Sequence, residues 1–207
     1  FDLDGTLVDS CEDIRVALNY CFEKRGIEGF SKEEVRRMVG EGVNRLIEKV
    51  LLARKVSLPF KEMIECFINY YSQHIADFSR LYPGVIETLE ELREIKKVVI
   101  SNKLTELSIK TLESLGIIKF FSFIAGSDFF PEKKPSPLPF IETMKRFKVL
   151  PDETLVVGDS ELDIEAGKLA GVKTIAVTYG YRNRDLLKNA DFVIDKFSDL
   201  VRIVKSL

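Results

Sequence analysis

Three aspartates lie within the first ten residues of the chain, FDLDGTLVDS, among apolar side chains. Asp2 and Asp4 are two residues apart, so their carboxylates project to the same side of an extended chain. Two carboxylates held side by side repel each other unless a metal ion or a proton is shared between them. The start of the chain therefore predicts a metal site or an acid–base pair built on Asp2 and Asp4.

Further polar residues follow two later apolar runs, and two lysines lie in a loop before a helical stretch. Ligands of an open α/β sheet bind outside the carboxyl ends of its strands. We expect these residues to meet Asp2 and Asp4 in one crevice, where acids, hydroxyls and lysines suit a metal ion and a phosphate group. They are Gly5 and Thr6 after the first strand, Ser101, Asn102 and Lys103 after KVVI, Asp159, Ser160 and Asp163 in GDSELD, and Lys133 and Lys134 before Pro135.

Short β-branched runs alternate with helical patterns from about residue 82 onward. Each run is apolar on both faces, as a buried parallel strand is. The runs cover 97–101, 121–126, 154–159, 172–178 and 191–194, and helical stretches cover 84–95, 105–116, 137–148 and 161–171. Thr105 is the expected N-cap of one helix, and Gly116 its end. The alternation predicts a doubly wound, Rossmann-like parallel sheet with helices on both faces.

The segment between the first strand and residue 82 is helical throughout. Ser31 and Glu34 form an expected capping box at one helix start. The helical stretches cover 12–26, 31–38, 43–55 and 60–78. We therefore expect an α/β core made of residues 1–11 and 82–207, with an all-helical cap domain at 12–81. Because a buried strand of about five residues is expected at FDLD, we also expect a few hydrophobic residues before Phe1.

The composition argues against several classes of protein. The 31 Lys and Arg residues against 33 Asp and Glu residues give a net charge of −2, which disfavours a nucleic-acid or anionic-membrane binder. No apolar run approaches the roughly 18 residues that a membrane span needs. We see no signal peptide. The expected partner is therefore a small molecule, and nothing in the sequence indicates an oligomeric state.

The cysteines and the histidine give no catalytic pattern. Cys11, Cys21 and Cys66 are odd in number and lack the spacing of a metal site, so we expect reduced thiols on helices of a cytoplasmic protein. His74 is the only histidine, which excludes any mechanism that needs two. We expect it on the surface.

The motifs DLDGT, SNK, KKPSPLP and GDSELD resemble, in order and spacing, the four motifs of the haloacid dehalogenase-like hydrolase superfamily. The helical segment after the first motif resembles that superfamily's helical cap. SNK, KKPSPLPF, GDSELDIEAGKLAG and TYGY (178–181) are most similar to phosphoglycolate phosphatases. This resemblance implies Mg²⁺-dependent hydrolysis of a phosphomonoester through an aspartyl-phosphate, with 2-phosphoglycolate as the expected substrate.

The resemblance also implies roles for the residues that carry the motifs. Asp2 would be the nucleophile and Asp4 the general acid and base. Lys134, which directly precedes Pro135 as in the family's motif, would neutralise Asp2 and the transferring phosphoryl group. The implied phosphate-binding groups are Thr6, Ser101 and the backbone N–H of Asn102. The implied metal ligands are Asp2, Asp159 and the backbone carbonyl of Asp4, supported by Ser160 and Asp163.

Several of these residues also have a purely structural interpretation. Ser160 and Asp163 have the spacing of a capping pair, which is compatible with a role at the site. Thr6 could cap a turn. Ser10 and Asp13 repeat the capping pattern, and there we prefer capping. Asp9 is expected to be structural.

Substrate choice is expected to come from the cap. GEGVNRL (40–46) is a glycine-bracketed turn before a helix, which is a natural anion site, and it resembles the cap loop of phosphoglycolate phosphatases. Phosphoglycolate carries a carboxylate besides its phosphate, so a cation is needed. Gly42 of this turn is a candidate substrate-side residue. Arg45 is the first candidate cation, weighed evenly against a solvated surface arginine, and Lys103 is the second.

Two other functions stay open at this point. One is a related phosphatase or phosphomutase that acts on sugar phosphates or pyrophosphate. The other is a regulator that binds Mg²⁺ and phosphate without turnover. A dehalogenase is disfavoured, because a halide leaving group would not need the acid at Asp4.

Overall fold

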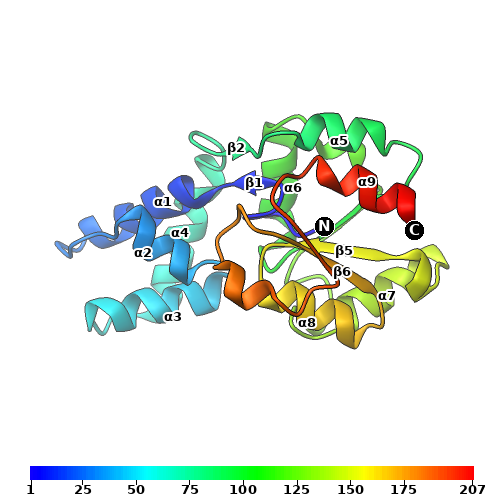
Figure 1. Ribbon diagram of the computed structural model, residues 1–207. Helices are drawn as coiled ribbons and strands as arrows, with labels where there is room; N and C mark the ends of the chain where they lie inside the picture. The colour runs from blue at the N-terminus through cyan, green and yellow to red at the C-terminus, as the bar shows by residue number, and fades with distance from the viewer.

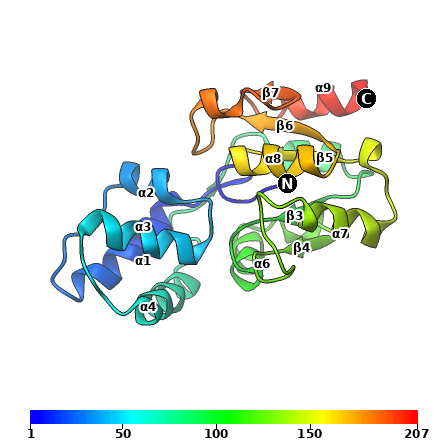
Figure 2. The same ribbon diagram turned by 90° about the horizontal axis from the view of Figure 1, so that it is seen from below.

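The computed structural model describes residues 1–207, which form two lobes lying side by side (Figures 1 and 2). The first lobe consists of α1 (Cys11–Glu23), α2 (Lys32–Met38), α3 (Val43–Arg54) and α4 (Phe60–Gln73). The second lobe contains β3 (Val98–Ile100), β4 (Phe123–Ala125), β5 (Leu155–Gly158), β6 (Lys173–Val177) and β7 (Phe192–Ile194). Its helices are α5 (Val85–Glu91), α6 (Thr105–Ser114), α7 (Leu138–Phe147), α8 (Glu161–Leu169) and α9 (Asp199–Ser206). None of these helices is long and apolar enough to cross a membrane.

Residues 1–3 join the strands of the second lobe into one parallel sheet. β3 pairs with β4, and β6 lies between β5 and β7, all in parallel. The backbone nitrogen of Phe1 donates to the carbonyl of Val98 on β3 at 2.8 Å. The backbone N–H of Asp2 donates to the carbonyl of Val157 on β5 at 2.9 Å. The first residues therefore lie where the sheet order changes direction, and this switch point is where α/β sheets bind ligands.

Helices cover both faces of this sheet. Val99 and Val157 pack into the apolar cluster that includes α5, α6 and α9. Their chain neighbours Ile100 and Val156 point to the opposite face and pack with α7 and α8. Because successive strand residues face opposite sides, a run that is apolar throughout serves both layers. The prediction of a doubly wound sheet is confirmed, and so is that of a helical insertion after the first strand.

Two chain segments connect the lobes and pair as a short antiparallel ribbon. They are β1 (Val8–Asp9) and β2 (Arg80–Leu81). The helical lobe has its own apolar core, centred on α1 and α4 and separate from that of the sheet. The division into a core (1–11 and 82–207) and a cap (12–81) is compatible with this ribbon and remains our proposal.

The capping pair expected at Ser10 and Asp13 is wrong. Ser10 precedes α1, but its side chain makes no capping bond and donates to Asp4 instead, at 2.5 Å. The buried Asp13 carboxylate accepts the backbone N–H and the hydroxyl of Ser79, at 2.7 and 2.5 Å. A buried carboxylate needs hydrogen-bond donors, and the segment returning from α4 to β2 supplies them. Helix α4 ends at Gln73 rather than near residue 78.

Two other local expectations also differ from the structure. The N-cap of α6 is Leu104, and Thr105 is the first residue of the helix. The Thr105 hydroxyl accepts the backbone N–H of Gly126 at 2.9 Å and donates to Asp128 at 2.7 Å instead of capping. Cys21 and Cys66 form a disulfide between α1 and α4, so the expectation of three reduced thiols is wrong. Cys11 is free and buried. The capping box of Ser31 is confirmed.

Candidate active site

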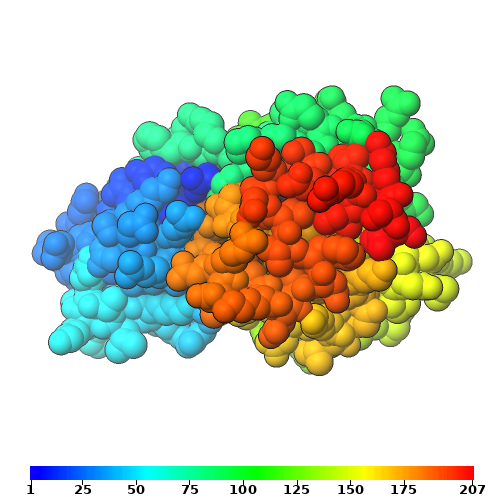
Figure 3. Space-filling view, viewed as in Figure 1, coloured from blue at the N-terminus to red at the C-terminus, as the bar shows by residue number.

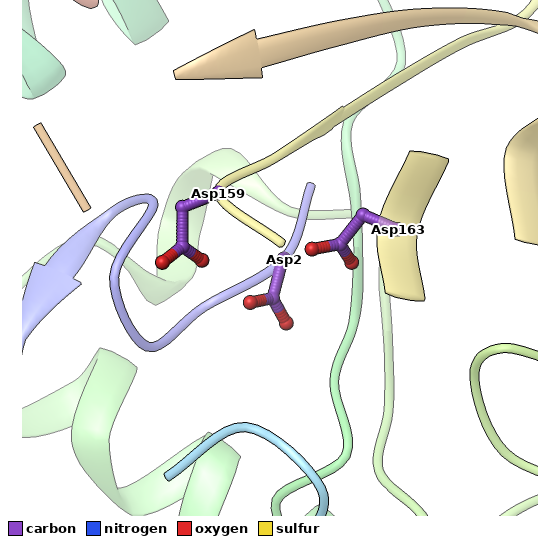
Figure 4. A group of neighbouring side chains, drawn as sticks. All are labelled: Asp2, Asp159 and Asp163. Atoms are coloured by element: carbon purple, nitrogen blue, oxygen red, sulfur yellow. The ribbon is translucent and has the colours of Figure 1, made fainter. Parts of the chain in front are cut away.

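The carboxyl ends of the strands bring three aspartates together (Figure 4). Asp2 follows the first residues of the chain, Asp159 follows β5, and Asp163 lies in the first turn of α8. Their carboxylates point into one space, with one oxygen of each within 4.8 Å of the others.

Lys134 is the cation of this acidic group. Its ammonium donates to Asp2 at 2.7 Å and to Asp163 at 2.5 Å, and the lysine is almost fully buried. Burial opposes the charge of Lys134, but the Asp163 and Asp2 carboxylates raise its pKa above the ordinary value. Lys134 therefore stays protonated and offsets only part of the negative charge of the three acids.

Burial and the remaining negative charge raise the pKa values of two of these acids. Burial raises the pKa of Asp2 to about 6, against the opposing effect of Lys134. Burial, with the charges of Asp2 and Asp163, also raises the pKa of Asp159 well above its ordinary value. Buried carboxylates with surplus negative charge and hard oxygen donors fit a divalent cation such as Mg²⁺.

The chain is shaped closely around Asp159. A Cβ at Gly5, whose φ is +90°, would lie 2.3 Å from Asp159 Oδ2, so only glycine fits there. The Thr6 hydroxyl donates to Asp159 Oδ1 at 3.3 Å, and the backbone N–H of Tyr181 donates to Oδ2 at 2.6 Å. The Thr6 hydroxyl therefore binds a candidate metal ligand, Asp159, whereas the sequence analysis assigned Thr6 to phosphate binding.

Asp163 combines two of the interactions expected for it. Its Oδ2 accepts the backbone N–H of Ser160 at 3.2 Å, as in the capping box of α8, and also the Ser160 hydroxyl at 2.6 Å. Its Oδ1 accepts Lys134. Capping and the support of Lys134 thus coexist in one side chain.

Asp4 takes part in a separate hydrogen-bond network. Asp4 Oδ1 accepts the Ser10 hydroxyl at 2.5 Å and the Lys103 ammonium at 2.8 Å. The Tyr181 hydroxyl in turn accepts the backbone N–H of Ser10 at 2.9 Å. Lys103 also donates to the hydroxyl of Tyr71 on α4, at 2.7 Å. This network fixes the Asp4 carboxylate with two donors.

Sequence reasoning gave no role at the site to Ser10, Tyr71 or Tyr181. Tyr181 belongs to the quoted TYGY stretch, which was a usable signal for it. Ser10 was assigned to capping, and Tyr71 has no sequence signal, because its position depends on how the helical lobe meets the sheet.

The SNK stretch after β3 supplies the next group of predicted residues. Ser101 and Asn102 are both buried. The Ser101 hydroxyl accepts the backbone N–H of Lys103 at 3.2 Å. The Asn102 amide donates to the carbonyls of Gly40 and Lys134, each at 3.0 Å. Asn102 therefore ties a loop of the helical lobe to the lysine loop of the core.

A cavity of about 60 Å³ lies between the lobes and is lined by residues of both. Asp2, Asp4, Ser101, Asn102 and Lys103 line it from the core, and Gly42 lines it from the helical lobe. The structure does not bring Arg45 to this cavity. Arg45 is exposed and pairs with Glu48 and Glu41 on its own lobe, because it lies on the outer face of α3.

Polar side chains fasten the helical lobe over the cavity. Lys133 donates to the carbonyl of Glu41 at 2.7 Å, and Arg182 donates to that of Val39 at 2.8 Å. Arg36 of α2 donates to the carbonyl of Gly180. In Figure 3 the orange surface, formed by the segment around residues 170–190, lies directly against the light-blue helical lobe. The lobes are therefore in contact around the site.

Comparisons with known proteins agree with this geometry. The sequence model of the family described as haloacid dehalogenase-like hydrolase matches residues 1–177. A phosphoglycolate phosphatase from Aquifex aeolicus is 40% identical over 207 residues, which cover 99% of this chain and 94% of the relative. One from Vibrio parahaemolyticus is 39% identical over 214 residues, with 99% and 94% covered.

Solved structures give the same result. A protein described as a predicted phosphoglycolate phosphatase from Haemophilus somnus superposes with a TM-score of 0.91 at 33% identity, covering 99% of this chain and 96% of its own. CbbY from Rhodobacter sphaeroides, solved in complex with phosphate, gives a TM-score of 0.84 at 26% identity, covering 97% and 94%. These findings confirm the resemblance predicted from the four motifs, including the likeness to phosphoglycolate phosphatases. The chain belongs to the haloacid dehalogenase-like hydrolase family.

Proposed function

We propose that this protein hydrolyses 2-phosphoglycolate to glycolate and phosphate in a Mg²⁺-dependent reaction. One observation carries the proposal: a single small cavity is lined by Asp2, Asp4 and Lys103, beside a buried acidic group. The names of the relatives at 39–40% identity support the same substrate.

Asp2 is the proposed nucleophile. A phosphomonoester dianion repels an attacking anion, so a covalent intermediate divides a difficult displacement into two easier ones. Asp2 attacks phosphorus and forms an aspartyl-phosphate as the bond to the leaving alkoxide breaks. Lys134, 2.7 Å from Asp2, orients this carboxylate and offsets its charge.

Asp4 is the proposed general acid and base. It gives a proton to the leaving alkoxide and then takes one from the water that hydrolyses the aspartyl-phosphate. Ser10 and Lys103 hold its Oδ1, which supports a fixed orientation for both transfers. The Ser101 hydroxyl and the backbone N–H of Asn102 are the proposed donors to the phosphoryl oxygens.

The proposed Mg²⁺ ligands are Asp2, Asp159 and the backbone carbonyl of Asp4. When bound there, the ion supplies the positive charge that the buried acids and the substrate dianion need. Ser160 and Asp163 hold Lys134 and the start of α8 in place. Thr6 orients Asp159 rather than the substrate in this proposal.

The cavity favours a short substrate over a sugar phosphate. Most side chains that the helical lobe contributes to it are apolar, so sugar hydroxyls would find few partners there. The same reasoning disfavours a phosphomutase for sugars. We keep the cytoplasm as the proposed location.

The test is phosphate release from a panel of esters with and without Mg²⁺. The panel contains 2-phosphoglycolate, two sugar phosphates and pyrophosphate, and Asp2→Asn is the control variant. A preference for 2-phosphoglycolate that EDTA and Asp2→Asn both abolish is expected. Similar Mg²⁺-dependent rates for all esters would refute 2-phosphoglycolate as the preferred substrate. If a folded protein released phosphate from no ester, the proposed phosphatase activity would be refuted.

A further inference from the structure

We propose that Tyr71 is a specificity-determining residue, whose hydroxyl joins the Lys103 ammonium in a subsite for an anionic group on the leaving group. The carboxylate of glycolate is a ligand of this kind. The inference deepens the proposed function and rests on it, since it concerns the leaving-group end of the same cavity.

Tyr71 supplies the polar side-chain atom that the helical lobe contributes to the cavity. It lies on α4 and is 1% exposed. The other cavity-lining residues of this lobe are Ile14, Val39, Gly40, Gly42, Val43, Leu46 and Phe67. The Tyr71 hydroxyl is therefore the one polar side-chain group of the helical lobe that an anionic group in the cavity can meet.

Tyr71 and Lys103 each have a hydrogen-bond donor to spare. The Lys103 ammonium has three N–H groups and uses two, toward Asp4 at 2.8 Å and the Tyr71 hydroxyl at 2.7 Å. The Tyr71 hydroxyl accepts from Lys103 and donates to no atom of the chain. Unused donors in a buried site cost free energy, so such a site favours a ligand that supplies acceptors.

A carboxylate matches these two donors. Its two oxygens lie on one carbon, and the donor atoms of Tyr71 and Lys103 are 2.7 Å apart. Each oxygen can thus accept one charge-assisted hydrogen bond. Burial raises the pKa of Tyr71 to about 12, which keeps its hydroxyl protonated as a donor at neutral pH.

The size and walls of the cavity restrict the ligand further. The cavity is small, about 60 Å³, which favours a short leaving group. The apolar walls offer nothing to additional hydroxyls. The predicted substrate class is therefore a phosphomonoester whose leaving group is short and carries one carboxylate.

The test compares Tyr71→Phe with Tyr70→Phe. Both variants lose one phenolic hydroxyl from neighbouring residues of α4. The Tyr70 ring stacks on those of Tyr20 and His74, at 4.1 and 4.3 Å between centroids, and does not line the cavity. The readout is the ratio of kcat/KM for 2-phosphoglycolate to that for ethyl phosphate, a neutral-tailed ester of similar length.

Wild type is expected to favour 2-phosphoglycolate at least about tenfold, and Tyr71→Phe to lower the ratio about tenfold while Tyr70→Phe keeps it. A general loss of structure would lower kcat/KM for both substrates together and leave the ratio unchanged. An unchanged ratio in Tyr71→Phe, an equal drop in Tyr70→Phe, or a wild type without preference overturns the inference.

Calorimetric titration of glycolate into the Mg²⁺-loaded protein separates this inference from the proposed function. We expect Tyr71→Phe to weaken glycolate binding about tenfold relative to wild type and Tyr70→Phe. If wild type binds glycolate in this way but hydrolyses no ester, the proposed function fails and the subsite stands. If glycolate binds wild type and Tyr71→Phe equally, the subsite is refuted even when turnover is normal.

Discussion

In the metal-free protein, the stability that Asp2→Asn gains relative to wild type should increase as the pH rises. In the folded protein the pKa of Asp2 is raised from 3.8 to about 6, chiefly by burial. Between these two pH values the folded protein keeps a proton that the unfolded chain releases, so its unfolding free energy falls as the pH rises. The loss is complete above the folded pKa and amounts to about 3 kcal/mol at about 1.4 kcal/mol per pKa unit.

The assay is urea unfolding of wild type and Asp2→Asn with EDTA at pH 4, 5.5 and 7. Asparagine keeps the shape of the side chain but does not titrate, so the difference in unfolding free energy reports the titration of Asp2 together with its effect on Asp159. We expect Asp2→Asn to gain about 2 kcal/mol on wild type between pH 4 and pH 7, because wild type has already lost part of this stability at pH 4. Asp152→Asn, in an exposed turn, is the matched control and should show no such trend.

Mg²⁺ should reverse the trend. At pH 7 the ion stabilises wild type by binding the folded state, whereas Asp2→Asn lacks one proposed ligand and gains less. If the stability difference between Asp2→Asn and wild type in EDTA does not change with pH, then Asp2 is not a buried carboxyl with a raised pKa. Equal stabilisation of both proteins by Mg²⁺ would refute its role as a ligand.

Three further predictions concern residues around the site and within the helical lobe. Thr6→Val should raise the Mg²⁺ concentration for half-maximal activity about tenfold, because the Thr6 hydroxyl orients Asp159. Thr6→Ser keeps the hydroxyl and should not change this concentration. A change only in the KM for the substrate would instead favour phosphate binding by Thr6. Ser10→Ala should lower kcat about tenfold with little effect on KM, since it frees Asp4 at one side, and unchanged steady-state kinetics would contradict this. Reduction with dithiothreitol should lower the unfolding free energy by about 2–4 kcal/mol, because Cys21 and Cys66 close a 45-residue separation; a Cys66→Ser variant should be insensitive to the reductant, and an unaffected wild type would count against the disulfide.

The sequence allowed the sheet and the acidic group to be predicted because both depend on local pattern. Apolar runs have the period of buried strands, and the polar residues that follow them meet at one edge of the sheet. Asp2, Asp159 and Lys134 could be placed in this way without knowledge of long-range packing. The short helix α9 was missed.

Features that depend on the contact between the lobes could not be predicted. Helical periodicity shows that α3 has an apolar face, but not how that face meets the core. Arg45 could therefore only be weighed evenly between a substrate contact and a solvated surface position, and the structure shows the surface position. The same limit applies to Tyr71, which reaches Lys103 across the interface. The pairing of Cys21 with Cys66 likewise requires α1 to pack on α4.

The covalent role of Asp2 is the central claim, and rapid acid quench tests it most directly. The protein is mixed with Mg²⁺ and 2-phosphoglycolate, quenched within one turnover, digested and analysed by mass spectrometry. We predict a peptide that carries one phosphoryl group on Asp2 in wild type and no such peptide in Asp2→Asn, which also loses turnover. Rapid turnover by wild type with Asp2 never modified, or retained turnover by Asp2→Asn, would contradict the account.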